Sequence, residues 1–241
     1  MCTLVFGLDP GGPRPVVAAA NRDEALDRPA EPPRWRAFGD RAPVFAPRDL
    51  RAGGTWIGVS PRGVFAALTN RFGGPPATDR RSRGHLVAEA LAHASAEAAR
   101  RWADRLDPAA YDGFHLVVAD RDRGFWVRAD GRSLASDWWA PGVHVVTERA
   151  WAAAPSERED WLREHLAQWT VDDLVFDRCR DLLLARPDRG LEGVLVRAPA
   201  RNYGTRSSAV VELLAAPRRT RFAFTEGPPD RTPFASAELE A

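Results

Sequence analysis

The chain opens with Met1-Cys2-Thr3-Leu4-Val5-Phe6-Gly7-Leu8-Asp9, an apolar run with a cysteine directly behind the initiator methionine. This run predicts a short buried β-strand. Because cysteine is small, we expect removal of Met1, which leaves Cys2 with both a thiol and a free α-amine. An α-amine titrates near about pH 8 and a thiol near about pH 8.5, so together they form a nucleophile and its base. The simpler interpretation is an ordinary buried cysteine near a chain end.

The overall composition is that of a globular protein. Of the 241 residues, 44% are apolar and 28% are charged. The net charge of +1 gives no electrostatic reason to expect a nucleic acid or a membrane as partner. All 34 basic residues are arginines, so no lysine is present to form a Schiff base.

The cysteines and the chain start bear on the compartment. Cys2 and Cys179 do not form a disulfide framework, which favours a reducing environment. No signal peptide is visible, and the apolar runs are too short to span a bilayer. We therefore expect a cytoplasmic protein without an integral membrane segment. Cys179 lies in an expected helix between two arginines, and we expect it to be inert.

Hydrophobic periodicity predicts hairpins interrupted by helices. Strands are expected at 15–20, 53–59, 63–70, 114–119, 125–128, 142–147, 208–214 and 221–225. Helices are expected at 82–106, 157–168 and 171–185, with irregular structure over 29–47. Because no regular βαβ alternation is present, this order predicts an α+β fold with antiparallel sheets. We expect a single domain over residues 1–241, with a tail from about residue 227 that lacks regular structure.

Other motifs give little support to a metal or cofactor site. Gly53-Gly54 precede an expected strand and not a helix, so they do not form a phosphate-binding loop. The five histidines lack the paired spacing of zinc ligands. His85 or His115 could be an axial haem ligand, but the neighbouring sequence selects neither. We expect no metal and no cofactor, with haem kept as an alternative.

Separated blocks of the sequence match one family in the same order. They are Met1-Cys2-Thr3, Asn21-Arg22-Asp23-Glu24 with Arg28-Pro29, Gly53-Gly54-Thr55-Trp56-Ile57-Gly58, Ala66-Ala67-Leu68-Thr69-Asn70 and Tyr203-Gly204-Thr205-Arg206-Ser207-Ser208. The chain resembles the NRDE family, also called the transport and Golgi organisation 2 family, from residue 1 to about residue 214. This resemblance implies the four-layer αββα sandwich of N-terminal-nucleophile hydrolases, with two antiparallel sheets between helices. Animal members are linked to Golgi organisation, lipid metabolism and haem trafficking.

The resemblance to cysteine acylases of that superfamily also implies site residues. Cys2 would attack an amide carbonyl, and its own amine would shuttle the proton. Asp23 would hold the amine, and Arg22 would favour the thiolate. Asn70 would donate a hydrogen bond to the oxyanion, a contribution of about 3–4 kcal/mol to the barrier. Arg206 would close the site.

The chain departs from the acylase pattern in two places. Arg22 and Asp23 are adjacent, whereas the acylases separate their arginine and aspartate by two residues. Adjacent strand residues face opposite sides, so Asn21 and Asp23 are the better pair on one face. The chain also has Val146-Thr147-Glu148 where an asparagine is expected, and an ionised carboxylate cannot donate to an oxyanion.

Two classes of function remain at this point. The first is an amidohydrolase that cleaves a non-peptide C–N amide bond of a small molecule through Cys2. The second is a non-catalytic protein on the same fold that binds or carries haem or a lipid-like ligand. Fold alone does not separate them, because function resides in the site. The sequence does not predict an oligomeric state.

Overall fold

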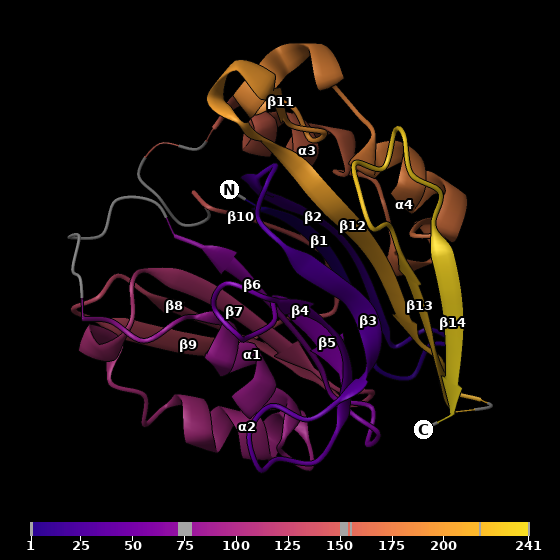
Figure 1. Ribbon diagram of the computed structural model, residues 1–241. Coiled ribbons are helices and arrows are strands. Elements are labelled where there is room, and N and C mark those ends of the chain that lie inside the picture. The colour runs from indigo at the N-terminus through magenta and orange to yellow at the C-terminus, as the bar shows by residue number, and fades with distance from the viewer. Residues whose placement is uncertain (1, 72–78, 150–153, 155, 217, 241) are drawn as a thin grey trace. The chain divides into compact units, whose positions relative to one another are not determined.

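The structure is a computed structural model that describes residues 2–71, 79–149, 154, 156–216 and 218–240 (Figure 1). The chain divides into two compact units. The first unit comprises Met1–Arg28 and Pro141–Leu239, and the second comprises Pro29–Ala140 and Glu240–Ala241. The single-domain assignment remains a prediction.

The first unit is built on a seven-stranded sheet with the order β10-β1-β2-β12-β13-β14, and β11 pairs with β12. Its strands are β1 (Cys2–Leu8), β2 (Val16–Ala25), β10 (Gly142–Thr147), β11 (Arg197–Ala198), β12 (Tyr203–Leu213), β13 (Arg219–Phe224) and β14 (Ala235–Glu240). The apolar run that opens the chain is β1, which pairs antiparallel with β2 on one side and β10 on the other. Every residue of β1 after Cys2 is buried, so side chains on both of its faces are shielded from water and the run is apolar at nearly every position.

Two helices, α3 (Glu157–His165) and α4 (Phe176–Leu183), cover one face of this sheet. Val5 and Val17 pack there against Leu162 and Leu182 in one buried cluster. Since strand side chains alternate, residues 3 and 5 of β1 and residues 17, 19, 21 and 23 of β2 share this face. Three short 3-10 segments complete the unit: η2 (Val171–Asp173), η3 (Pro187–Glu192) and η4 (Pro199–Arg201).

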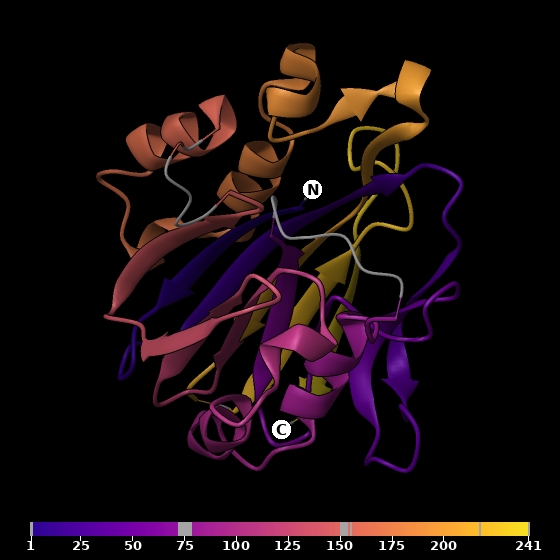
Figure 2. The same cartoon turned by 90° about the vertical axis from the view of Figure 1, so that its left-hand side faces the viewer.

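The second unit is built on an antiparallel sheet with the order β3-β4-β5-β6-β7-β8-β9. Its strands are β3 (Ala30–Arg36), β4 (Val44–Asp49), β5 (Ile57–Val59), β6 (Phe65–Asn70), β7 (Phe114–Ala119), β8 (Gly124–Ala129) and β9 (Leu134–Trp138). The helices α1 (Gly84–Leu91) and α2 (Ala96–Ala103) pack on one face (Figures 1 and 2), and η1 (Pro108–Ala110) follows.

The close packing of α1 explains one glycine of the Gly53-Gly54 pair. A Cβ atom on Gly54 would lie 2.5 Å from the carbonyl carbon of Gly84, the first residue of α1. The Thr55 N–H also donates to the Gly84 carbonyl at 3.1 Å. The glycine therefore lets the loop before β5 approach the helix backbone.

The α+β class with two antiparallel sheets and helices is confirmed, and each unit supplies one sheet with its helical layer. In the part of the chain that the structure describes, no helix has the length and apolarity needed to cross a bilayer.

Several segments differ from the sequence expectation. The helix expected at 171–185 is the 3-10 segment η2 followed by the shorter helix α4. The helix expected at 82–106 is two helices, because Ser95 caps α2 by accepting a hydrogen bond from the Ala98 N–H. The segment 29–47 is not irregular but contains β3 and most of β4. Pro32 and Pro33 lie on the edge strand β3 within a register shift, where proline is tolerated. The tail after residue 227 forms the edge strand β14.

Candidate functional site

Cys2 begins a row of side chains that crosses three strands of the first unit. It pairs with Arg22 of β2, and Arg22 pairs with Ser207 of β12. Residues directly opposite each other on neighbouring strands share a face. This face is the one away from α3 and α4, because the neighbouring Asn21 bonds to the backbone of α4. Cys2 is partly buried, whereas Arg22 and Ser207 are buried.

Asn21 lies on the helix-covered face and holds the sheet to its helical layer. Its Nδ2 donates to the carbonyls of Leu183 at 2.9 Å and Val194 at 2.8 Å. Its Oδ1 accepts from Ser208 Oγ at 2.5 Å. These three bonds use nearly all of the hydrogen-bonding capacity of the amide and hold it in one orientation. The catalytic role of Asn21 stays a prediction.

Asp23 lies on the same face as Asn21, is 2% exposed, and is fixed through three of its oxygens. Thr205 Oγ1 donates to Asp23 Oδ1 at 2.7 Å, and Arg158 Nη1 donates to Oδ2 at 3.1 Å. The hydroxyl of Tyr203 donates to the Asp23 backbone carbonyl at 2.8 Å. A carboxylate held by two side-chain donors has one orientation, as a catalytic group requires.

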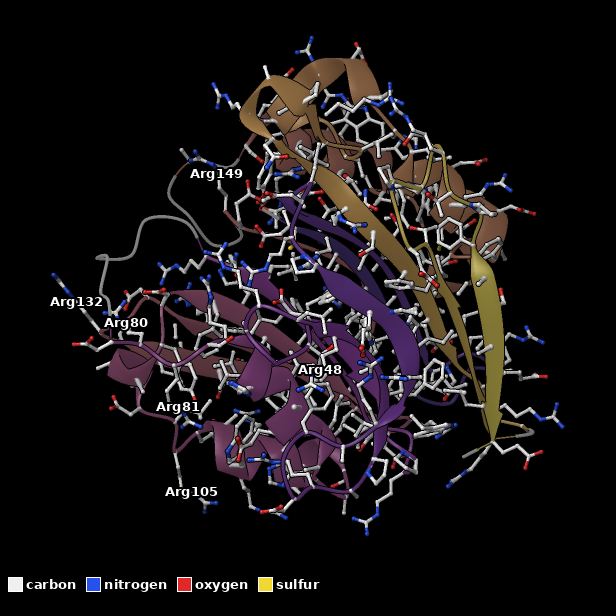
Figure 3. The ribbon with its side chains drawn as sticks, viewed as in Figure 1. Arg48, Arg80, Arg81, Arg105, Arg132 and Arg149 are labelled. Carbon is white, nitrogen blue, oxygen red and sulfur yellow. The ribbon has the colours of Figure 1, made fainter. Side chains whose placement is uncertain are left out.

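Arg158, in the first turn of α3, joins Asp23 to a second carboxylate. Its Nη2 lies 2.9 Å from both Glu148 Oε1 and Oε2, and its Nη1 also donates to Thr3 Oγ1 at 3.2 Å. Arginines such as Arg105 and Arg132 point away from the ribbon (Figure 3). The Arg158 side chain, in contrast, is fully buried. Glu148 thus accepts hydrogen bonds from Arg158 and does not act as a donor. The glutamate that stands in place of the expected asparagine pairs with this buried arginine.

The pKa values follow from this burial. Desolvation raises the pKa of Asp23 from 3.8 to about 6, against the opposing charge of Arg158. Desolvation also raises the pKa of the Cys2 thiol, and the Asp23 carboxylate adds to this effect. The Asp23 backbone N–H and the Arg22 guanidinium act in the opposite direction on Cys2. The Cys2 thiolate therefore has a donor and a cation that favour it, although burial outweighs them.

Arg206 and Asn70 are the two remaining predicted residues. Arg206 occupies a register shift of β12, between Thr205 and Ser207, and its Nη1 donates to the Glu226 carbonyl at 3.1 Å. Asn70 ends β6 in the second unit, opposite Phe114, and is partly exposed. Its role toward an oxyanion at Cys2, like the catalytic role of Arg206, stays a prediction.

Arg158, Thr205 and Tyr203 were not among the predicted catalytic residues. Thr205 and Tyr203 belong to one of the sequence blocks that carry the family resemblance. Arg158 carries a weaker signal: it is a cation in the first turn of a helix, where the helix dipole disfavours positive charge. Because Glu157, Glu159 and Asp160 lie in the same turn, this placement alone does not reveal its partners Asp23 and Glu148.

The two histidines considered for haem are both in the second unit. His115 is 1% exposed on β7, and its Nδ1 lies 3.1 Å from Thr69 Oγ1. His85 is partly buried in α1. Within the described ranges, no group of three or more histidine, cysteine, aspartate or glutamate side chains is arranged to hold a metal ion.

The chain shares its fold with solved structures of N-terminal-nucleophile hydrolases. The N-acylethanolamine-hydrolyzing acid amidase ortholog of Caenorhabditis elegans matches with a TM-score of 0.61 and 13% identity, over 87% of this chain and 92% of the other. Penicillin V acylase from Agrobacterium tumefaciens matches with a TM-score of 0.53 and 14% identity, over 92% and 82%. The C2A mutant of conjugated bile acid hydrolase from Clostridium perfringens matches with a TM-score of 0.53 and 10% identity, over 99% and 92%.

The chain belongs to the Transport and Golgi organisation 2 family, whose family model matches residues 1–226. The mouse Transport and Golgi organization 2 homolog is 33% identical over 130 residues, which are 50% of this chain and 45% of that protein. The bovine homolog is 35% identical over 130 residues, again 50% of this chain and 45% of that protein. The matched stretch thus spans about half the length of these relatives.

Proposed function

We propose that the protein is a cysteine N-terminal-nucleophile amidohydrolase that cleaves a non-peptide C–N amide bond of a small molecule through Cys2. The observation that carries this proposal is the placement of Cys2 at the start of β1, directly across from Arg22 and next to the backbone N–H of the clamped Asp23. The names of the structural neighbours, an amidase, an acylase and a conjugated bile acid hydrolase, support the same reaction class.

Arg22 and Asp23 point to opposite faces of the sheet, and we assign them different roles in catalysis. Arg22 shares the face of the Cys2 side chain and favours its thiolate. The α-amine of a mature Cys2 belongs to the backbone of β1 and to neither face. The Asp23 carboxylate can therefore bind that amine even though its side chain lies on the helix-covered face. In this mechanism Asp23 holds the amine while Arg22 acts on the sulfur.

The reaction then runs in two balanced steps. The Cys2 thiol proton passes to the α-amine as Sγ bonds to the amide carbonyl carbon, and the same proton goes to the leaving nitrogen as the C–N bond breaks. Water hydrolyses the resulting thioester, which releases a carboxylic acid and restores the thiol. Asn70 is the proposed donor to the oxyanion, and Arg206 is proposed to close the site.

The buried cluster of Asp23, Arg158 and Glu148 sets the charge near the amine. With both carboxylates ionised, two negative groups share one guanidinium, and the cluster carries one net negative charge. A buried net charge is costly unless an opposite charge is near. In the proposed mechanism this opposite charge arises when the Cys2 amine accepts the thiol proton and becomes an ammonium.

The test begins with the mature N-terminus, since Met1 lies outside the described residues. We expect the intact mass to show loss of Met1, and a cysteine-directed acylating probe to label Cys2 but not Cys179. A panel of N-acyl amides should then yield a substrate whose hydrolysis disappears in Cys2→Ala. A retained methionine with an unreactive Cys2 would contradict the proposal and favour a carrier of haem or of a lipid-like ligand.

A further inference from the structure

A small cavity in the first unit lies behind the side chains that hold Asp23. Its volume is about 110 Å³. Apolar residues supply most of its wall: Leu26 after β2, Leu195 and Ala198 near β11, Pro199, Tyr203 of β12, and Pro228. An apolar cavity of about 150 Å³ is large enough to bind benzene, so this one accepts a hydrocarbon group of slightly smaller size.

The cavity is coupled to the candidate site through two of its wall residues. Tyr203 donates its hydroxyl to the Asp23 carbonyl, and Thr205 donates to Asp23 Oδ1. Burial raises the pKa of the Tyr203 hydroxyl, and the negative charges of Asp23 and Cys2 raise it further. The Tyr203 side chain therefore borders the cavity and also lies within electrostatic reach of the Cys2 sulfur.

The charged residues of the cavity wall carry an excess positive charge. Arg197 Nη2 lies 2.5 Å from Asp230 Oδ2, and Arg231 Nε lies 3.4 Å from the same oxygen. Two guanidinium groups thus share one carboxylate, which leaves one net positive charge. The Arg231 side chain is 77% exposed, so it can turn toward a ligand at little cost.

We propose that this cavity binds a short aliphatic group that ends in a carboxylate. The apolar wall takes the hydrocarbon part, and Arg231 with Arg197 takes the negative charge at the mouth. Binding there does not depend on turnover. The further statement, that this group is one end of the amide substrate, rests on the proposed function of Cys2.

The binding test uses the full chain with Cys2→Ala, which cannot turn over an amide through Cys2. Straight-chain carboxylates of two to ten carbons are titrated by calorimetry. We expect the tightest binding at about four to six carbons, because a longer chain exceeds the volume of the cavity. Ala198→Phe fills the cavity and should weaken this binding by at least about tenfold. The matched control is Ala167→Phe, at an exposed position after α3, which should leave binding unchanged.

A second variant tests the role of the Arg231 charge at the mouth of the cavity. Arg231→Gln should weaken carboxylate binding by about tenfold and leave binding of the neutral amide of the same chain length unchanged, because charge-assisted hydrogen bonds are the stronger ones. If Ala198→Phe does not fold by circular dichroism, Ala198→Leu replaces it as the filling variant.

The outcomes separate the two proposals. Carboxylate binding that is the same with and without the filling substitution overturns the cavity proposal, and so does an absence of binding at every chain length. Hydrolysis of an amide through Cys2 that is insensitive to the filling substitution would show that the cavity does not hold the substrate, while the function of Cys2 stands. Cavity binding with an inert Cys2 would remove the proposed function and leave the cavity proposal intact.

Discussion

At the scale of single residues, Arg158 explains more of the candidate site than any position that the motifs marked. It contacts Asp23 from β2, Thr3 from β1 and Glu148 after β10. One buried guanidinium therefore ties three neighbouring strands to α3. Because the guanidinium is removed from water, Arg158 stabilises the fold only when both carboxylates are present to pair with it.

Removing Arg158 should be strongly destabilising. Arg158→Met leaves two buried carboxylates without their shared cation, a change that typically costs about 3–5 kcal/mol in the free energy of unfolding. Glu148→Gln should cost less, about 1–2 kcal/mol, because Gln keeps an acceptor for Nη2 and Asp23 keeps its ion pair. Urea unfolding of both variants and of the double variant gives the coupling energy. A coupling energy near zero would contradict the shared-cation interpretation.

The raised pKa of Asp23 predicts a pH dependence of stability. The folded state holds the proton more tightly than the unfolded state, with a pKa of about 6 against 3.8. The resulting stabilisation is therefore complete below about pH 3.8 and is lost as the pH rises through about 6. The shift corresponds to about 3 kcal/mol. Urea unfolding at pH 4 to 7 should show wild type losing stability relative to Asp23→Asn by an amount of that order. Parallel curves for the two proteins would contradict the raised pKa.

At the scale of elements, the sequence predicted strands by their composition but not their partners. The apolar run of β1 identifies a buried strand, and 142–147 identifies β10, yet nothing in either sequence indicates that the two pair. Such pairing is set by packing between segments that are far apart in the chain. The same reason hides Arg158, because its three partners come from three different segments.

The element errors have local causes. The proline-rich segment 29–47 reads as irregular, since proline removes a strand hydrogen bond. Pro32 and Pro33 nevertheless lie in β3, at the edge of the second sheet and within a register shift, where that bond is not needed. The continuous helix expected at 82–106 overlooks the cap at Ser95, which starts a new helix. Composition alone does not distinguish these cases from an ordinary loop or an ordinary helix.

At the scale of the whole molecule, the chain order constrains how the first unit forms. Its sheet pairs β1 and β2, from the first 28 residues, with β10 and β12, from beyond residue 140. The core between this sheet and its helices therefore needs both ends of the chain. Cys179 lies in that core, is fully buried, and has a pKa raised to about 12 by desolvation.

This burial makes Cys179 a reporter of unfolding in the Cys2→Ala protein, in which it is the remaining cysteine. A thiol reacts as its thiolate, so a buried thiol with a raised pKa reacts only when the core opens. We expect its labelling by a thiol-reactive probe at pH 8 to be negligible in the native protein, and to rise with urea in parallel with the loss of far-ultraviolet circular dichroism. The fully denatured protein supplies the reference rate. Labelling at a comparable rate without urea would show that the helical layer of the first unit opens independently of its sheet, which the packing of Cys179 between them does not permit.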